Sequence, residues 1–374
     1  MRLPGRPLYY LVVIAYLVGA VLLRISDPFP VEALRYLGFD LYQRIDPAPP
    51  VADKPVVIVD IDEDSLKALG QWPWPRTRMA ELAQRLFEAG AATVAFDMLF
   101  SEADQTSPEE VVKRLPPEQA ALVAGSIDPA AGNDKALAAI LAQTPSVLGI
   151  SLSRGGGEKP QIRAGFAVAG DDPKPFVPDF VGAIRNLPAL EDAAPGAGSI
   201  NWIPDRDQIV RRVPLIFRVG NQFVPSLAAE ALRVVQGAGS YVLKSSNANG
   251  EEAFGAETGL NHIKIGELVV PTDAEGAIWL RFRPSDPGSF IPARTVLDRT
   301  MPADAVNGRI VLIGTSAAGL LDLRATPIDV AVPGVEIHAQ VIEHILSGQF
   351  LARPDYARGV ELAVMVLLGL LLAV

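Results

Sequence analysis

The feature that most constrains this chain is an apolar segment without charge near its N-terminus. Residues 8–23 read LYYLVVIAYLVGAVLL. A bilayer-spanning helix needs about 20 apolar residues, and Arg24 extends this segment because its long side chain reaches the membrane surface. The segment therefore predicts a transmembrane helix over residues 8–25. A cleaved signal peptide is the alternative, but no small-x-small cleavage site follows before Arg24.

A second apolar segment closes the sequence. Residues 362–374 read LAVMVLLGLLLAV and predict a second transmembrane helix, truncated within the span, over residues 360–374. A buried C-terminal helix is the alternative. Arg2 and Arg6 precede the first span, and the positive-inside rule makes residues 1–7 a cytoplasmic tail. The chain between the two spans is then expected outside the cytoplasm.

The composition excludes several classes of function. The formal net charge is −10, so the chain lacks the basic surface of a nucleic-acid-binding protein, and we expect no such partner. The absence of cysteine excludes disulfides, Cys-ligated zinc, iron–sulfur clusters and thiol catalysis. His338 and His344 lie six residues apart, which places them on different sides of a helix, so they cannot share one metal ion. We expect that no cofactor is required.

Buried strands that alternate with amphipathic helices predict an α/β fold. Residues 55–63 (PVVIVDIDE) and 91–100 (AATVAFDMLF) are continuous apolar runs, which are typical of buried parallel strands. The helical pattern over residues 65–90 joins them as a βαβ unit, and residues 307–319 (NGRIVLIGTSAAG) are predicted as the last strand. We therefore expect a mostly parallel sheet with flanking helices, a late β-rich insertion and transmembrane helices at both ends.

The remaining chain is predicted as one domain with a helix beside the membrane. Residues 26–45 are predicted as a membrane-proximal amphipathic helix, with Val31, Leu34, Leu41 and Ile45 near one face. Residues 46–352 follow as the extracytoplasmic domain. Within this domain we expect long loops over residues 101–133, 154–175 and 236–259, and a β-hairpin over residues 264–283 with its turn near Asp273–Gly276.

Polar side chains stand where three of the predicted strands end. Ligands bind beyond the carboxyl ends of parallel strands, so these residues form one crevice if the strands are neighbours. Arg76 is a further candidate because it stands at a predicted helix start, where anions bind. The candidate ligand-binding residues are Asp60, Asp62, Asp97, Thr315, Ser316, Asp322, Arg324 and Arg76.

Three interpretations of this crevice stay open. It binds a small ligand or a hard cation such as Ca²⁺, or it is a structural network in which Arg324 pairs with Asp62 or Asp97. The third interpretation is catalytic, because VVIV followed by D-I-D resembles the first motif of haloacid-dehalogenase phosphatases. That match fails at Asp64, where Thr or Val is expected, and no later magnesium-binding motif follows. The candidate metal ligands are Asp62, Asp97 and Asp322.

Several motifs at the two ends of the predicted domain occur together. They are LGQWPWPR (69–76), FDMLF (96–100), NGRIVLIGTS (307–316) and GVEIHA (334–339). In this combination the sequence resembles the CHASE2 domain, the second class of cyclase/histidine-kinase-associated sensory extracellular domains. The resemblance covers about residues 30–352, and the middle of the chain is weakly marked.

This resemblance implies a sensory function without catalysis by this chain. Such domains lie outside the cytoplasm of bacterial receptors and regulate cytoplasmic outputs, which include class III adenylate cyclases, serine/threonine kinases and histidine kinases. We favour a cyclase parent in the bacterial inner membrane, and this parent implies a homodimer. The sensed partner is a small ligand or an envelope protein. The alternatives are a kinase receptor, a membrane-anchored periplasmic hydrolase that uses Asp60 and Asp62, and a protein-interaction module.

Overall fold

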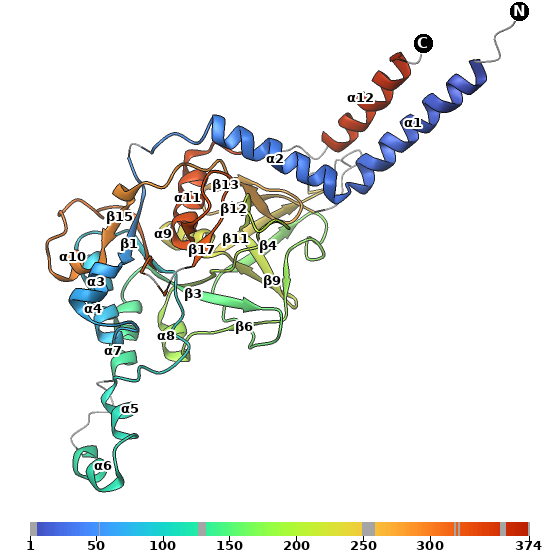
Figure 1. Ribbon diagram of the computed structural model, residues 1–374. Coiled ribbons are helices and arrows are strands. Elements are labelled where there is room, and N and C mark those ends of the chain that lie inside the picture. Colours follow the sequence, from blue (N-terminus) through green and yellow to red (C-terminus); the bar gives the residue numbers. More distant parts are fainter. Residues whose placement is uncertain are drawn as a thin grey trace, which may run out of the picture.

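A parallel-rich β-sheet forms the centre of the structure (Figure 1). The structure is a computed structural model that describes residues 6–51, 53–125, 132–248, 259–317, 319–320, 322–351 and 357–372. The strand order is β15–β1–β16–β2–β3, and β3 also pairs with β6 and β7. Every pairing is parallel except that of β3 with β6, which confirms the mostly parallel sheet. The strands are β1 Val56–Ile61, β2 Thr93–Phe96, β3 Ser146–Ser153, β6 Gly182–Ile184, β7 Gly196–Ser199, β15 Phe290–Pro292 and β16 Ile310–Thr315.

The last strand of this sheet along the chain, β16, lies between the first two, β1 and β2. Asp60 of β1 is in register with Gly314 of β16, and Ile313 of β16 is in register with Phe96 of β2. Three strands that are distant in sequence therefore end side by side. This arrangement brings their following residues to one edge of the sheet.

Helices cover both faces of the sheet, because side chains of each strand alternate between the faces. Val57 and Val59 pack with Leu82 of α4, whereas Ile58 packs in a cluster that contains Ile337 of α11. The first face carries α3 Glu63–Leu69, α4 Arg76–Glu88, α7 Asn133–Leu141 and α10 Ala293–Leu297, with α8 Pro188–Ala193 against α7. The second face carries α9 Leu227–Val235 and α11 Gly334–Ser347.

A β-rich insertion separates β3 from β16, as expected. Two predicted loops are wrong in part: β4 lies within residues 154–175 and β11 within residues 236–259, because the two strands pair with each other across a long separation that local patterns do not reveal. The larger added sheet contains β4 Gly165–Ala169, β11 Ser240–Ser245, β12 Leu260–Ile265 and β13 Leu268–Pro271. The other strands are β5 Asp179–Phe180, β9 Ile216–Val219 and β10 Gln222–Pro225, then β8 Arg212–Pro214 with β14 Ala277–Trp279, and β17 Leu323–Arg324 with β18 Val332–Pro333.

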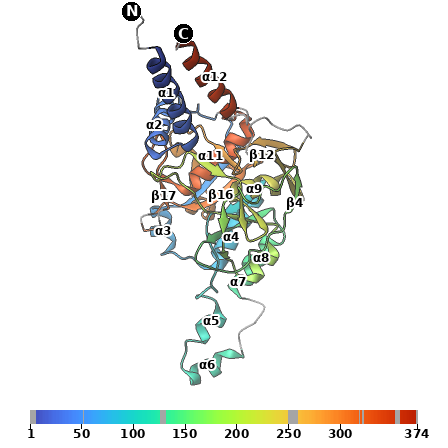
Figure 2. The same cartoon turned by 90° about the vertical axis from the view of Figure 1, so that its right-hand side faces the viewer.

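An arm projects from the domain on the side opposite α1 and α12 (Figures 1 and 2). It contains two short helices, α5 Pro108–Val112 and α6 Pro117–Ala124. The sequence predicts a loop over residues 101–133, so these helices correct that prediction. Both begin at a proline, which is preorganised for the first turn of a helix.

The two ends of the chain form helices that leave the domain together (Figures 1 and 2). α1 spans Arg6–Ser26, α2 spans Phe29–Ile45 and α12 spans Ala357–Leu372. Among the described residues, one helical stretch, Tyr9–Ser26, is long and apolar enough to cross a membrane, and Gly359–Leu371 is apolar but shorter. The second transmembrane helix therefore stays a prediction. Residues 1–5 of the predicted tail, residues 249–258 and residues 373–374 lie outside the described residues.

Candidate functional site

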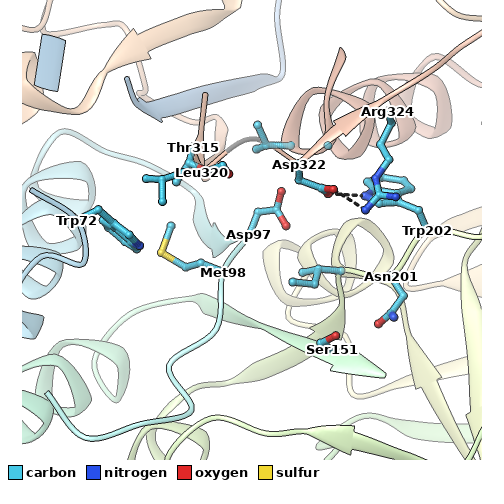
Figure 3. Close-up of a pocket in the computed structure, with 13 residues that line it drawn as sticks. Trp72, Asp97, Met98, Ser151, Asn201, Trp202, Thr315, Leu320, Asp322 and Arg324 are labelled. Atoms are coloured by element: carbon cyan, nitrogen blue, oxygen red, sulfur yellow. Dashed lines mark hydrogen bonds and ion pairs between the residues drawn. The ribbon is translucent and has the colours of Figure 1, made fainter. Parts of the chain in front are cut away.

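A pocket of about 420 Å³ opens where β2 and β16 end (Figure 3). Asp97 follows β2, Thr315 ends β16, and Asp322 and Arg324 come from the segment after β16. Four predicted residues therefore line one pocket, because β2 and β16 are parallel neighbours in the sheet and end side by side. The apolar part of the wall contains Trp72, Met98, Ile200, Trp202, Leu320 and Val335.

Asp97 is the most enclosed acid of the pocket wall. Its side chain is 11% exposed, against 48% for Asp322. Its backbone N–H donates to the carbonyl of Ile313 at 2.8 Å, which fixes it to the end of β16. Burial raises the pKa of Asp97 to about 7; the nearby Asp322 adds to the rise, and Arg324 opposes it. The carboxyl group therefore exchanges its proton near neutral pH.

His338 of α11 lies behind the pocket wall, next to Asp97. Its Nε2 is 4.0 Å from Asp97 Oδ1, and its ring lies 4.2 Å from that of Trp202. Neither ring nitrogen of His338 has a hydrogen-bond partner within the described residues. Burial lowers the pKa of His338 to about 3, so the imidazole is neutral at physiological pH. The His338–Asp97 contact is thus a pair with unused hydrogen-bonding capacity.

Asp322 joins two side chains of the pocket wall. Its Oδ2 accepts a hydrogen bond from Trp202 Nε1 at 3.2 Å, and its Oδ1 pairs with Arg324. The sequence interpretation paired Arg324 with Asp62 or Asp97, and the structure corrects this. Asp322 and Arg324 flank one residue of an extended segment, so their side chains leave the chain on the same side.

Asp60 and Ser316 bind each other and do not line the pocket. Ser316 Oγ donates to Asp60 Oδ2 at 2.5 Å, while Asp60 Oδ1 has no partner within the described residues. Burial raises the pKa of Asp60 to about 6, and the hydrogen bond from Ser316 opposes the rise. This pair fastens the end of β1 to the chain that leaves β16.

Asp62 and Arg76 have other roles than lining the pocket. Asp62 is the N-cap of α3 and accepts a hydrogen bond from the Ser65 backbone N–H at 2.7 Å. Arg76 packs its guanidinium 4.6 Å from the centre of the Phe100 ring and forms an ion pair with Asp134 at 3.5 Å. Within the part of the chain that the structure describes, no three acidic or histidine residues are grouped as metal ligands.

Two glycines allow α11 to approach the strand ends closely. A Cβ atom at Gly314 would lie 2.6 Å from Val335, and one at Gly334 would lie 2.6 Å from the Asp322 carboxylate. The start of α11 therefore packs directly on β16 and on the pocket wall. A side chain at Gly314 would meet Val335 Cβ and force α11 away from the sheet, whereas one at Gly334 would displace the carboxylate of Asp322.

Sequence reasoning missed the contribution of the chain after β7. Asn201 and Trp202 follow that strand and line the pocket, and the side chain of Asn201 bonds both backbone groups of Leu152. The strand-end argument would have found them if residues 196–199 had been identified as a sheet strand. Trp72 of the LGQWPWPR motif also lines the pocket, whereas Trp74 of the same motif is buried in the core.

The wall that contains Trp202 continues to α2. Arg211 lies at the end of this segment and donates to both carboxylate oxygens of Asp40 on α2, at 2.7 and 2.8 Å. Arg211 also bonds Asp205 at 3.1 Å and Asp207 at 2.7 Å, and its side chain is 1% exposed. The guanidinium is 4.4 Å from the centre of the Tyr36 ring on the same helix. We call these residues the Arg211 junction.

The wall that contains Asp322 and Arg324 also continues to α2. The carbonyl of Ala325 accepts a hydrogen bond from the Val210 backbone N–H at 2.8 Å, one residue before Arg211. The carbonyl of Pro327 accepts a hydrogen bond from Arg44 Nε on α2 at 2.8 Å. Each wall of the pocket therefore continues along its own chain segment to a residue that bonds α2: Arg211 in one segment and Pro327 in the other.

Comparison with known proteins gives the family of the chain. The family model for the CHASE2 domain matches residues 12–374. The chain belongs to the CHASE2 family. CHASE2 domains are extracytoplasmic sensor domains of signalling receptors and are not catalytic. No curated protein and no solved structure matches the chain.

Proposed function

We propose that this CHASE2 chain is the periplasmic or extracellular sensory region of a bacterial inner-membrane receptor. The receptor regulates a cytoplasmic output domain, which we propose is an adenylate cyclase that makes cAMP. The sensory region works as a homodimer and binds a small ligand in the pocket beside Asp97 and Asp322. A serine/threonine or histidine kinase output is the alternative to the cyclase.

The observation that carries this proposal is the convergence of both pocket walls on α2. A sensor must connect its ligand site to the elements that enter the membrane. Trp202 and Asp322 lie in the two walls, and the chain from each leads to Asp40 and Arg44 of α2. A ligand that moves the walls apart would therefore move α2, which is two residues from the end of α1.

The packing of α1 against α12 supports a membrane location for both ends. Arg24 donates to Glu361 Oε2 at 2.5 and 3.1 Å, so the two helices are joined close to the domain. Gly369 packs against Leu17 with no room for a side chain. Small residues at such contacts are typical of helices that pack within membranes. A change in α2 would then reach an output domain through this helix pair.

The polar groups of the pocket indicate how it would respond to a ligand. Asp97 and Asp322 attract a cationic or hydrogen-bond-donating group, and the two tryptophans give apolar surface beside them. Because the pKa of Asp97 is about 7, a donor placed against it would favour the charged carboxylate. Ca²⁺ stays a proposal of the same kind, with Asp97 and Asp322 as ligands and without Asp62, which caps α3.

The test uses the complete receptor that we propose, studied in cell membranes. We expect these membranes to form cAMP from ATP. Asp322→Asn should change the basal rate roughly fivefold or more, because it removes the charge that pairs with Arg324 and leaves a single oxygen to accept from Trp202 where the two walls meet. Asp298→Asn is the matched control, since Asp298 is exposed and outside the pocket. An equal rate in both variants would contradict a coupled pocket, and a kinase activity in place of cAMP would contradict the cyclase output.

A second candidate function is favoured by the arm. α5 and α6 project from the domain, and Leu122 at the arm is 82% exposed. An envelope protein that binds this arm would replace the small ligand as the sensed partner. Leu122→Glu should then abolish regulation while Asp322→Asn has no effect, which is the reverse of the result expected for the pocket.

A further inference from the structure

Helix α2 has its polar side inside and its apolar side outside. Tyr36, Asp40 and Gln43 are buried against the domain. On the other side lie four aliphatic residues that are each between 57% and 70% exposed. They follow one another at intervals of three, four and four residues, which places them in one line along the helix. We call them the outer stripe: Leu34, Leu37, Leu41 and Ile45.

The polar side of α2 is fixed in place by the domain. Asp40 is held by Arg211, and the side-chain amide of Gln43 donates to the Leu280 carbonyl at 2.8 Å. Gln43 Oε1 also accepts a hydrogen bond from the Phe282 backbone N–H at 2.9 Å. A rotation of α2 that buried the outer stripe would break all of these bonds. The outer stripe therefore faces away from the domain in the folded protein.

The position of α2 in the chain indicates what covers the outer stripe. Only Asp27 and Pro28 separate α2 from α1. Asp27 has a positive φ of 39°, and Arg35 bonds both of its carboxylate oxygens, at 2.8 and 2.9 Å. The chain bends at this point, so that α2 runs along the end of the domain from which α1 and α12 leave (Figure 1). If α1 crosses a membrane, α2 begins at the surface of that membrane.

We propose that α2 lies on the membrane with its outer stripe inserted among the lipids. This inference rests on the proposed membrane anchoring by α1. Phe29 and Tyr42, 55% and 76% exposed, provide aromatic side chains suited to the membrane interface. Such a helix, apolar on the lipid side and polar on the protein side, is an interfacial helix. α2 thus joins the lipid surface to the Arg211 junction.

The test places single fluorescent labels on the full chain in lipid vesicles. Because the sequence has no cysteine, each introduced cysteine is the only thiol. Leu41→Cys and Ile45→Cys carry a label that reports lipid contact, in vesicles of phosphatidylcholine and phosphatidylglycerol. Leu122→Cys on the arm is the exposed control, and Val18→Cys within α1 reports the anchor itself. Each sample is quenched separately by aqueous iodide and by doxyl-labelled lipid.

We expect iodide to quench the labels at 41 and 45 roughly threefold or more weakly than the label at 122, and doxyl lipid to quench them strongly. Strong iodide quenching at 41 and 45 would overturn the inference. Protection from both quenchers, together with disulfide formation between unlabelled Leu41→Cys chains, would also overturn it and would assign the outer stripe to a second copy. If doxyl lipid quenches the label at 18 while iodide quenches the labels at 41 and 45, the inference about α2 is refuted but the membrane anchoring by α1 is not. A label at 18 in water would refute the membrane anchoring as well.

Discussion

Arg211 and Asp97 are both charged residues of the domain interior, but their surroundings differ. Three carboxylates, those of Asp40, Asp205 and Asp207, accept hydrogen bonds from Arg211 and satisfy its guanidinium. Asp97 has His338 as its buried neighbour, at 4.0 Å, and both ring nitrogens of His338 lack a partner within the described residues. Both regions are buried. The donors of Arg211 all have acceptors, whereas the ring nitrogens of His338 have no partner within the described residues.

The difference teaches which region is fixed and which can respond. A buried network with satisfied groups has one favourable arrangement, because any movement exposes an unpaired charge. The Arg211 junction therefore acts as a rigid joint between the domain and α2. The Asp97 region keeps unused donors and acceptors beside a pocket, so a ligand or a proton changes its energy. We infer that signals begin at Asp97 and pass through the Arg211 junction.

The largest expected loss of stability comes from a substitution in the Arg211 junction. Arg211→Met takes the ion-pair partner from the buried Asp40, while Asp205 keeps Tyr36 and Arg212, and we expect the substitution to lower the free energy of unfolding by about 3–5 kcal/mol. Arg206→Met is the control, because the Arg206 side chain is 69% exposed, and it should change stability by no more than about 0.5 kcal/mol. Denaturant unfolding of the detergent-solubilised chain measures both. Equal stability of the two variants would refute the rigid joint.

The next effect concerns the responsive side and depends on pH. The folded pKa of Asp97, about 7, lies above the unfolded value near 4, so the folded state binds the proton more tightly. Stability from this group is present at low pH and is lost as pH rises from about 4 to 7. Asp97→Asn removes this loss and should raise the free energy of unfolding at pH 8 by about 3 kcal/mol, with little change at pH 4.

The same unfolding measurement, repeated across this pH range, tests the prediction for Asp97. Asp298→Asn, an exposed carboxylate replaced in the same way, should leave the pH profile unchanged. A variant Asp97→Asn that is less stable than the parent at pH 8 would mean that the folded domain requires the charged carboxylate. The contrast with Arg211 would then disappear.

A smaller effect on stability is expected where α11 packs on β16, next to the pocket region that contains Asp97. Gly314→Ala places a Cβ atom 2.6 Å from Val335 and should cost about 1–3 kcal/mol through overpacking. The double variant Gly314→Ala/Val335→Ala removes the two Val335 methyl groups, at 2.7 and 2.8 Å, but keeps the Cβ atom, and should recover part of the loss. Thermal unfolding compares the single and double variants. If Val335→Ala gives no recovery, α11 does not pack on β16 as described.

The smallest expected effect tests whether Asp62 only caps α3 or also belongs to the region around Asp97. Asp62→Ala removes the N-cap of α3 and should lower the free energy of unfolding by about 1 kcal/mol. Because Asp62 does not line the pocket, the pH dependence that arises from Asp97 should stay the same. Asp62→Asn is the control, since asparagine also caps helices. Asp62 also helps to raise the pKa of Asp60, so the contribution of Asp97 is taken as the difference between Asp62→Ala and Asp62→Ala/Asp97→Asn; a change in that difference would return Asp62 to the site.

The sequence predicts the responsive region better than the rigid one. Asp97 and Thr315 could be placed because the ends of apolar strands are visible in the sequence and parallel strands end at one edge. The partners of Arg211 could not be predicted, because Asp40 is 171 residues away and no local pattern joins them. Leu34, Leu41 and Ile45 of the outer stripe were predicted on one apolar face, but with Val31 in place of Leu37. Only the contacts of Asp40 and Gln43 show that the polar side of α2 is buried.

The β-hairpin shows the same limit. The sequence predicts a turn near Asp273–Gly276, whereas β12 and β13 are joined at Gly266, which has a φ of 57°. The residues after Gly276 pair instead with β8, more than 60 residues earlier. Turn chemistry identified a real turn, but it does not specify which strands pair on either side of it.

The most direct test of the account is hydrogen–deuterium exchange of the full chain in lipid nanodiscs, with and without the substitution Asp322→Ala. This substitution removes the bonds to Trp202 and Arg324 at the pocket and touches no residue of α2. The account predicts faster exchange over residues 203–211 and over α2, with unchanged exchange in α7 on the other face of the sheet. Faster exchange confined to the pocket wall, with α2 unchanged, would contradict the coupling of the pocket to the membrane-proximal helix.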